Sequence, residues 1–169
     1  MGCPGDRARA RGRRTGARVT GVAYFRVLTK IEAPAGRVWE LLADWEGSSA
    51  WMVDATTVEV LGEQRAGVGT RVKAITRIAG VPLTDVMEVF EWEPNRVLGV
   101  KHEGWPIRGL AWFELREPGD GTTLFEWAEE LDPPLGPLGE LGGAILRRPI
   151  ERVLRKSAAK LKALAEARS

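Results

Sequence analysis

A run of strand-like segments between turn signals, followed by one long helical segment, constrains this fold most. The segments are rich in β-branched and aromatic residues, and Gly, Pro or Asn lies between them, as is typical of strands joined by tight turns. Because the connections are short, neighbouring strands should pair antiparallel. The expected strands cover residues 54–62, 69–79, 82–92, 96–103, 107–116 and 122–131.

The segment before these strands predicts a further strand and then helices. Residues 20–32 are rich in β-branched and aromatic side chains, which indicates a strand. Pro34 suits the first turn of a helix, and the apolar residues that follow it are spaced for a helix over 34–43. Residues 44–52 combine Gly and Ser with large aromatics and can hold a second short helix.

The end of the chain predicts a long helix from about Leu138. Its apolar residues recur every three or four positions, at Ile150, Leu154, Ala158, Leu161 and Ala165. Pro149 and the Gly142-Gly143 pair weaken its first part, which predicts a late start or a kink; the alternative is a lid over residues 132–143. The fold class is therefore α+β, with a seven-stranded antiparallel sheet covered by this helix.

Composition limits the number of domains and the chemistry. A chain of 169 residues with 44% hydrophobic and 28% charged residues fits one globular domain, here 19–169. The single cysteine, Cys3, forbids an internal disulfide, and with a single histidine, His102, a zinc site is nearly excluded. We expect no metal and no cofactor.

Residues 1–18 form a segment of distinct composition. They hold six arginines against Asp6, a net charge of +5, so the rest of the chain carries −3 within the total of +2. We expect a disordered Arg-rich arm, because few of its residues can be buried. The arm is either a weak tether to nucleic acid or an anionic membrane, or an unselected leader. The mildly acidic body gives no reason to expect specific nucleic-acid binding.

Neither an export signal nor a transmembrane segment is apparent in the sequence. No run of about 18 apolar residues occurs, and Arg13-Arg14 is not followed by an apolar stretch. We therefore expect a cytoplasmic protein.

A series of short motifs, in order along residues 22–167, resembles a known superfamily. These motifs are Ile31-Glu32-Ala33-Pro34, Val38-Trp39 with Leu41, Asp44-Trp45, Trp51-Met52, Gly67-Val68-Gly69-Thr70, Val89-Phe90-Glu91-Trp92-Glu93-Pro94, Gly121-Thr122, and Leu138-Gly139-Glu140-Leu141-Gly142-Gly143. The sequence resembles the START/Bet v 1-like (SRPBCC) superfamily of polyketide cyclases/dehydrases and lipid-transport proteins. The resemblance implies a helix-grip fold, with the curved sheet wrapped around the long helix and two short helices between strands one and two.

The resemblance also implies an elongated cavity, between the sheet and the C-terminal helix, for lipids, polyketides or other hydrophobic molecules. It places the segment after the first helix at the cavity mouth, which makes Trp45, Trp51 and Met52 the leading wall candidates. The full set of expected ligand-binding residues is Trp45, Trp51, Met52, Arg77, Glu88, Phe90, Trp105, Trp112, Trp127, Leu141 and Ile145. For each tryptophan the alternative is ordinary core packing, and for the basic residues a solvated outer face.

Catalytic residues are harder to choose. His102 is the side chain whose ordinary pKa lies nearest neutrality, yet no partner is apparent and a surface or capping role is favoured over catalysis. No serine or cysteine has the context of a nucleophile. Carboxylates that alternate with apolar residues can reach a cavity and act as acids, and the candidates are Glu88, Glu91, Glu126 and Glu130. An inward Arg77 or Arg108 would anchor an enol or a carboxylate.

Three function classes follow from this sequence. We favour binding or transport of a hydrophobic small molecule. The alternative is a polyketide cyclase, aromatase or dehydratase that uses Glu and Arg side chains in the cavity, and a third class is an interaction module built on the Arg-rich arm. A cavity with several convergent polar groups would favour the enzyme, whereas purely apolar walls would favour the carrier. The sequence leaves the ligand and the oligomeric state open.

Overall fold

The computed structural model describes residues 23–78, 80–105, 107–132 and 137–167, with residues 78 and 137–146 described by their backbone only. The elements are, in order, β1 (Ala23–Ile31), α2 (Ala35–Ala43), the 3₁₀ helix η1 (Glu46–Ala50), β2 (Ala55–Leu61), β3 (Arg71–Ile78), β4 (Val81–Glu93), β5 (Val97–His102), β6 (Gly109–Arg116), β7 (Thr123–Leu131) and α3 (Pro137–Glu166). The strands form one antiparallel sheet in the order β1-β7-β6-β5-β4-β3-β2. The predicted α+β class and element order are confirmed. The expected arm over 1–18 lies outside the described residues.

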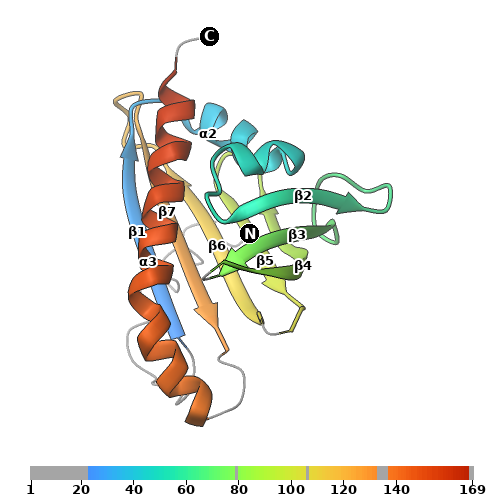
Figure 1. Cartoon of the computed structure of the whole chain (residues 1–169). Helices are drawn as coiled ribbons and strands as arrows, with labels where there is room; N and C mark the ends of the chain where they lie inside the picture. The colour runs from blue at the N-terminus through green and yellow to red at the C-terminus, as the bar shows by residue number, and fades with distance from the viewer. Residues whose placement is uncertain (1–22, 79, 106, 133–136, 168–169) are drawn as a thin grey trace, which may run out of the picture.

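The sheet curves around the space beside α3, which runs along β1, while α2 lies beside the upper part of α3 (Figure 1). The apolar stripe predicted for this helix faces the core, because Leu154, Ala158, Leu161 and Ala165 are all buried. The helix begins at Pro137 and contains Pro149, so the expected late start is wrong. A lid over 132–143 stays a prediction, since residues 133–136 are not described.

Alternation along the strands decides which residues enter the core. In β7 the inward set contains Phe125, Trp127 and Glu129, all buried, while the residues between them lie on the outer face. In β4 the register shifts between Val89 and Glu91, which marks a β-bulge. Beyond the bulge Trp92 reaches the inner side, with its ring 5.0 Å from that of Trp39.

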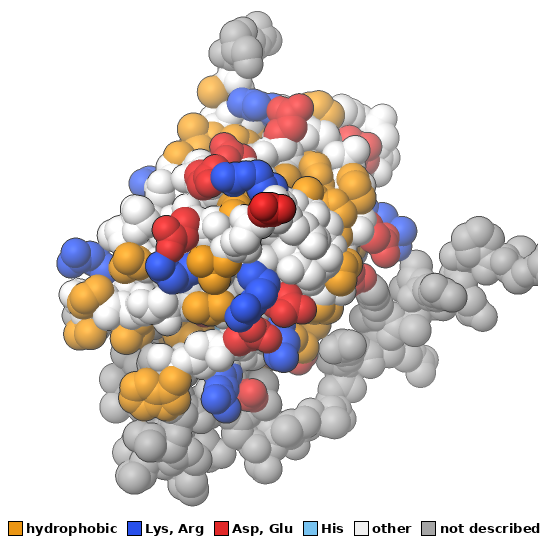
Figure 2. All heavy atoms as spheres, turned by 90° about the vertical axis from the view of Figure 1, so that its right-hand side faces the viewer, with side chains coloured by type: hydrophobic (Ala, Val, Ile, Leu, Met, Phe, Trp, Pro, Cys, Tyr) orange, Lys and Arg blue, Asp and Glu red, His pale blue; other side chains and the backbone are white. Residues whose placement is uncertain are grey.

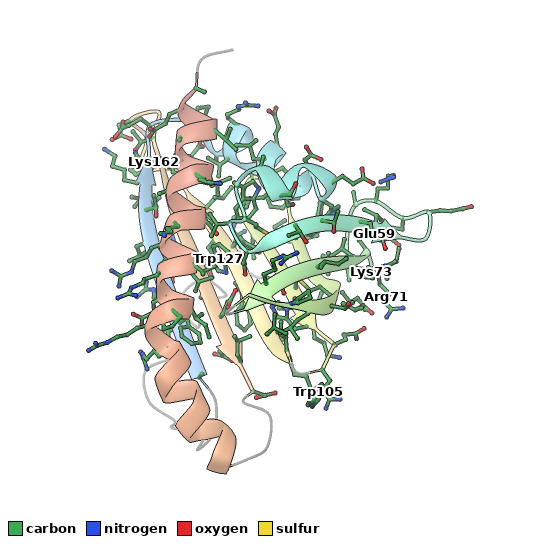
Figure 3. All side chains as sticks on the ribbon, in the orientation of Figure 1. Glu59, Arg71, Lys73, Trp105, Trp127 and Lys162 are labelled. Carbon is green, nitrogen blue, oxygen red and sulfur yellow. The ribbon has the colours of Figure 1, made fainter. Side chains whose placement is uncertain are left out.

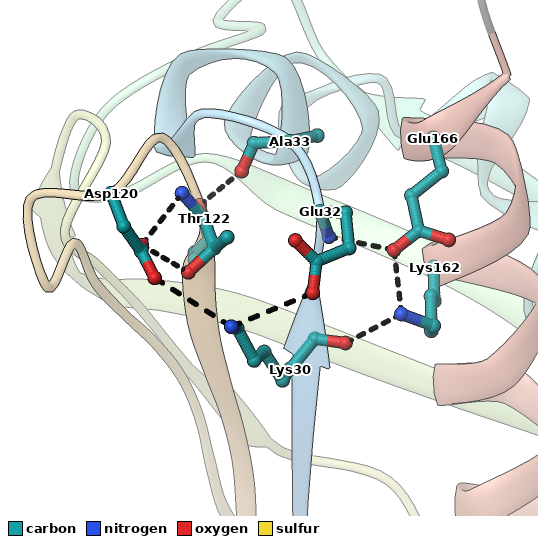
Figure 4. A network of polar contacts seen from close by, with 8 residues as sticks. Lys30, Glu32, Ala33, Asp120, Thr122, Lys162 and Glu166 are labelled. Carbon is teal, nitrogen blue, oxygen red and sulfur yellow. Dashed lines mark hydrogen bonds and ion pairs between the residues drawn. The ribbon is translucent and has the colours of Figure 1, made fainter.

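Polar contacts hold the C-terminal turns of α3 against the edge strand β1 (Figure 4). The Lys162 ammonium donates to the carbonyl of Lys30 at 2.7 Å and lies 2.5 Å from Glu166. Glu166 accepts the backbone N–H of Glu32 at 2.6 Å. Nearby, the Thr123 hydroxyl donates to the carbonyl of Ala33 at 2.7 Å. These bonds satisfy backbone groups at the edge of the sheet, where strand pairing ends.

Charged side chains of both signs are interspersed with hydrophobic ones on the face seen after the 90° turn (Figure 2). Several of the charged residues on β2 and β3 form pairs, for example Lys73 with Glu59, and Arg71 with Glu103 at 3.2 Å. Within the described chain, no helix is both long and apolar enough to cross a membrane.

Candidate functional site

A cavity of about 40 Å³ lies inside the core, between the inner face of β4–β7 and the segment from α2 to β2. Its wall is mostly apolar and includes an aromatic group in which Trp51 lies 6.3 Å from Phe113 and 5.9 Å from Trp127, measured between ring centres. Phe113 and Trp127 are 5.0 Å apart. Such a wall suits a flat or elongated apolar ligand.

The sheet register explains why space remains here. Ala111 on β6 pairs with Val100 on one side and Glu129 on the other. All three residues line the cavity, and the small side chain of Ala111 leaves space between the two larger ones.

Four of the expected wall residues line the cavity: Trp45, Trp51, Met52 and Trp127. Trp127 projects from β7 into the space beside α3 (Figure 3). The indole of Trp51 donates to the carbonyl of Leu41 at 3.3 Å, and that of Trp45 to the carbonyl of Arg65 at 3.1 Å. The first bond joins Trp51 to α2, and the second joins Trp45 to the loop between β2 and β3.

Among residues 147–166 of α3, whose side chains are described, none lines the cavity. The described lining residues lie on the sheet and on the segment from α2 to β2, so a cavity that also reaches the C-terminal helix stays a prediction. The side chains of Leu141 and Ile145, expected at the site, lie outside the described part of the structure.

The other expected residues lie away from the cavity. Glu88, Phe90 and Trp112 are on the outer face, where the rings of Phe90 and Trp112 are 5.7 Å apart, because the inward residues of β4 before the bulge are Asp85, Met87 and Val89. Arg77 is exposed on β3. Trp105 is 72% exposed and lies at the end of the sheet (Figure 3).

The remaining acidic and basic candidates also lie outside the cavity lining. Glu126 accepts two hydrogen bonds from Arg26 on the outer face, at 2.6 and 3.0 Å. Glu91 and Glu130 are not cavity residues either. Arg108 lines a separate groove and donates from Nε to the carbonyl of Gly104 at 3.3 Å.

His102, which lines the cavity, forms a buried polar pair with Asp85. Nδ1 of His102 lies 2.8 Å from Oδ2 of Asp85, and both side chains are buried. Nε2 of His102 and Oδ1 of Asp85 are buried without a hydrogen-bond partner among the described residues. The expected surface role of His102 is wrong, because His102 shares the inward face of β5 with Leu98 and Val100.

Glu129 is the second titratable group in the described lining, which also includes Ser48, and it was not among the residues expected from the sequence. Its Oε1 accepts a hydrogen bond from the Trp127 indole at 2.9 Å. The signal was present, since Phe125, Trp127 and Glu129 alternate on one face of β7. Asp85 was missed for the same reason, although it alternates with Met87 and Val89 on β4.

Burial sets the protonation of these groups. Burial raises the pKa of Glu129, and the charge of His102 and the bond from Trp127 offset this only in part. For His102, burial opposes the charged ring, but the hydrogen bond and charge of Asp85, with the charge of Glu129, raise its pKa overall. Burial also raises the pKa of Asp54, just before β2. The described residues contain no group of three side chains suited to a metal ion.

A second hollow, a polar groove of about 490 Å³, lies beside the ends of β5, β6 and β7. It is lined by Lys101, His102, Glu103, Arg108, Gly109, Leu110 and Asp132. His102 lines both hollows, so it marks the boundary between the apolar cavity and the more polar end of the sheet.

Solved structures share this fold at low sequence identity. The Zhui aromatase/cyclase from Streptomyces sp. R1128 is 19% identical, with a TM-score of 0.73 over 86% of this chain and 94% of its own. The di-domain ARO/CYC BexL of the BE-7585A biosynthetic pathway is 18% identical, with a TM-score of 0.69 over 88% of this chain and 51% of its own. A START superfamily protein from Mycobacterium smegmatis is 14% identical, with a TM-score of 0.62 over 85% of this chain and 94% of its own.

Sequence comparison gives the family. No curated protein matches the chain in sequence. The family model described as "Polyketide cyclase / dehydrase and lipid transport" matches residues 22–166, which is nearly every described residue. The chain therefore belongs to the polyketide cyclase/dehydrase and lipid-transport family, within the START/Bet v 1-like superfamily.

Proposed function

We propose that this protein binds a hydrophobic small molecule in the cavity between the sheet and the α2–η1 segment. The observation that carries the proposal is the aromatic wall of Trp51, Phe113 and Trp127. The same lining holds three polar residues, Ser48, His102 and Glu129. An apolar wall with few, well-placed polar groups is how most small-molecule sites are built. Membership of a family of polyketide cyclases and lipid-transport proteins supports the same conclusion.

Ligand binding requires the cavity to widen. Its volume of about 40 Å³ is close to that of one water molecule, whereas sites for drug-sized ligands occupy roughly 300–1,000 Å³. Met52 follows η1, is half-buried and lines the cavity. Because the Met side chain is unbranched and flexible, it can change rotamer at low cost. We therefore expect the wall formed by the η1 segment to move when a ligand enters.

The direct test is native mass spectrometry of the protein purified from its own source, followed by organic extraction. The proposal predicts a discrete 1:1 adduct, whose extracted component is an apolar molecule. Protein that carries no adduct, and that takes up none from an organic extract of the source cells, would contradict it.

One observation favours a second candidate, the cyclase or dehydratase function. Nδ1 of His102 lies 2.8 Å from Asp85, Nε2 has no hydrogen-bond partner among the described residues, and His102 lines the cavity. A histidine oriented by a carboxylate is a common general base. In this scheme Nε2 removes a proton from the carbon beside a ketone, and the same proton then leaves with the β-hydroxyl group as water. An enone forms, and His102 returns to its neutral state.

Turnover of an aromatic β-hydroxyketone to its enone, followed by absorbance, tests this second candidate. Catalysis through His102 predicts acceleration by the wild type and a loss of about 10²–10⁴-fold in His102→Gln. Equal rates in the wild type, the variant and buffer would rule it out and leave the binding function alone.

A further inference from the structure

We infer that Glu129 recognises its ligand as a neutral carboxylic acid, donating a hydrogen bond to a carbonyl oxygen, so that the site prefers ketone-bearing apolar molecules to hydrocarbons of the same shape. The inference rests on the proposed binding function. It names both the chemical class of the ligand and the residue that selects it.

The geometry of Glu129 assigns a different role to each carboxyl oxygen. The Trp127 indole N–H can only donate, so Oε1, at 2.9 Å, is an acceptor. In a neutral carboxylic acid the proton then belongs on Oε2. Glu129 lines the cavity, is only 8% exposed, and forms no ion pair with a described residue. A donor is thus held beside an apolar wall.

The charged groups around Glu129 belong to three other parts of the chain. His102 comes from β5, Asp85 from β4, and Asp54 from the segment before β2. The one cationic group, His102, directs its Nδ1 to Asp85 and not to Glu129. Burial, with a smaller effect of the two nearby carboxyl groups, raises the pKa of Glu129 and outweighs the opposing charge of His102 and the bond from Trp127, which favours the neutral form.

A buried hydrogen-bond donor discriminates between ligands, because a ligand without an acceptor leaves the donor unpaired. A ketone oxygen accepts the Oε2 proton, whereas a hydrocarbon that fills the same space covers the donor and gives it no partner. Leaving a buried donor unpaired is costly, and sites built around a polar group reject analogues that lack its partner. In a family member whose ligand is a plain hydrocarbon chain, a buried carboxylic acid donor would gain no partner from the ligand.

The test uses two probes of matched shape, 2-acetylnaphthalene and 2-isopropenylnaphthalene, which differ only in C=O against C=CH₂. Binding is measured by tryptophan fluorescence with the full chain, for the wild type, Glu129→Gln and Glu129→Leu. We expect the wild type to bind the ketone about tenfold more tightly than the alkene. Glu129→Gln should keep most of this preference through its amide N–H, and Glu129→Leu should lose it.

A spectroscopic measurement separates recognition from a merely structural role. With a ¹³C-labelled ketone, infrared spectra should show the carbonyl stretch at lower frequency in wild-type complex than in the Glu129→Leu complex. Equal affinity of the wild type for both probes, or an unshifted carbonyl stretch, would overturn the inference while the binding function stands. Failure of both probes to bind any of the three proteins would count against both proposals.

Discussion

Nδ1 of His102 lies 2.8 Å from Oδ2 of Asp85, across two adjacent strands and inside the core. A carboxylate accepts the Nδ1–H, so the neutral ring carries its proton on Nδ1 and presents Nε2 as an acceptor. His102 therefore has the orientation of a base, and Glu129 that of an acid, in one cavity lining. The proposed catalysis depends on His102, and the proposed preference for ketones depends on Glu129.

Asp85→Asn should lower the pKa of His102. The hydrogen bond and the negative charge of Asp85 raise that pKa against the effect of burial, and an amide provides no charge. Since the chain has one histidine, its ring C–H signal in an NMR titration needs no assignment. Asp120→Asn, an exposed change, is the control. An unaltered His102 titration in Asp85→Asn would show that the pair does not set the charge of the ring.

Glu129→Gln should reduce the dependence of stability on pH. Because the pKa of Glu129 is raised on folding, the folded state keeps a proton that the unfolded state loses above its ordinary pKa of about 4.3. The proton on Glu129 stabilises the folded state fully below the unfolded-state pKa, and this stabilisation is lost as the pH rises through the folded-state pKa. Between about pH 5 and about pH 8 the wild type should therefore lose more stability than the variant.

Urea unfolding at both pH values measures this difference, and the free energies are compared between the two proteins. Glu63→Gln, at an exposed position, should follow the wild type. If Glu129→Gln lost as much stability over this range as the wild type, Glu129 would be ionised in the folded protein.

Lys162→Ala should loosen the contact between α3 and β1. The ammonium of Lys162 donates to the carbonyl of Lys30 and holds Glu166, which accepts the N–H of Glu32. We expect a loss of about 1 kcal/mol in the free energy of unfolding and faster amide exchange at the end of α3. Lys156→Ala, an exposed change on the same helix, should alter neither. Equal effects of the two changes would mean that the contact in Figure 4 is not stabilising.

Gly109→Ala should be strongly destabilising. A Cβ at this position would lie 2.0 Å from the carbonyl oxygen of Glu130, and the backbone φ of 142° already disfavours a side chain. Gly119→Ala is a matched control, since its φ is 100° and nothing lies within 4 Å of the added atom. Thermal unfolding should show a loss above about 3 kcal/mol for Gly109→Ala and a smaller one for the control. Similar losses would show that the strand shifts to accept the methyl group.

The fold was predictable because its signals are local. Turn residues mark the strand ends, and the apolar spacing of Leu154, Ala158 and Leu161 marks the buried face of α3. The cavity residues that follow α2 could also be predicted, because the family resemblance places this segment at the cavity. The face of the sheet on which each side chain lies was harder to predict, because several strands have charged or aromatic residues on both faces.

Glu129 and Phe90 show why the site could not be fully predicted. Glu126 and Glu130 are the candidate acids that the sequence suggests in β7, yet the alternation with Phe125 and Trp127 places Glu129 inward. In β4 the alternation that buries Met87 and Val89 places Phe90 on the outer face. The bulge after Val89 then returns Trp92 to the inner side, out of step with that alternation. His102 gains its partner from Asp85, 17 positions away, through strand pairing alone.

The proposed binding site is tested most directly by measuring ligand binding after a larger side chain has filled the cavity. Ala111→Leu places a larger side chain between Val100 and Glu129, whereas Ala128→Leu adds the same bulk on the outer face of the neighbouring strand β7. Native mass spectrometry would compare the two variants and the wild type after exposure to an organic extract of the source cells, with thermal unfolding to establish that each is folded. We expect a bound ligand in the wild type and Ala128→Leu and none in Ala111→Leu. Undiminished ligand in folded Ala111→Leu would place the binding site elsewhere and contradict the proposal.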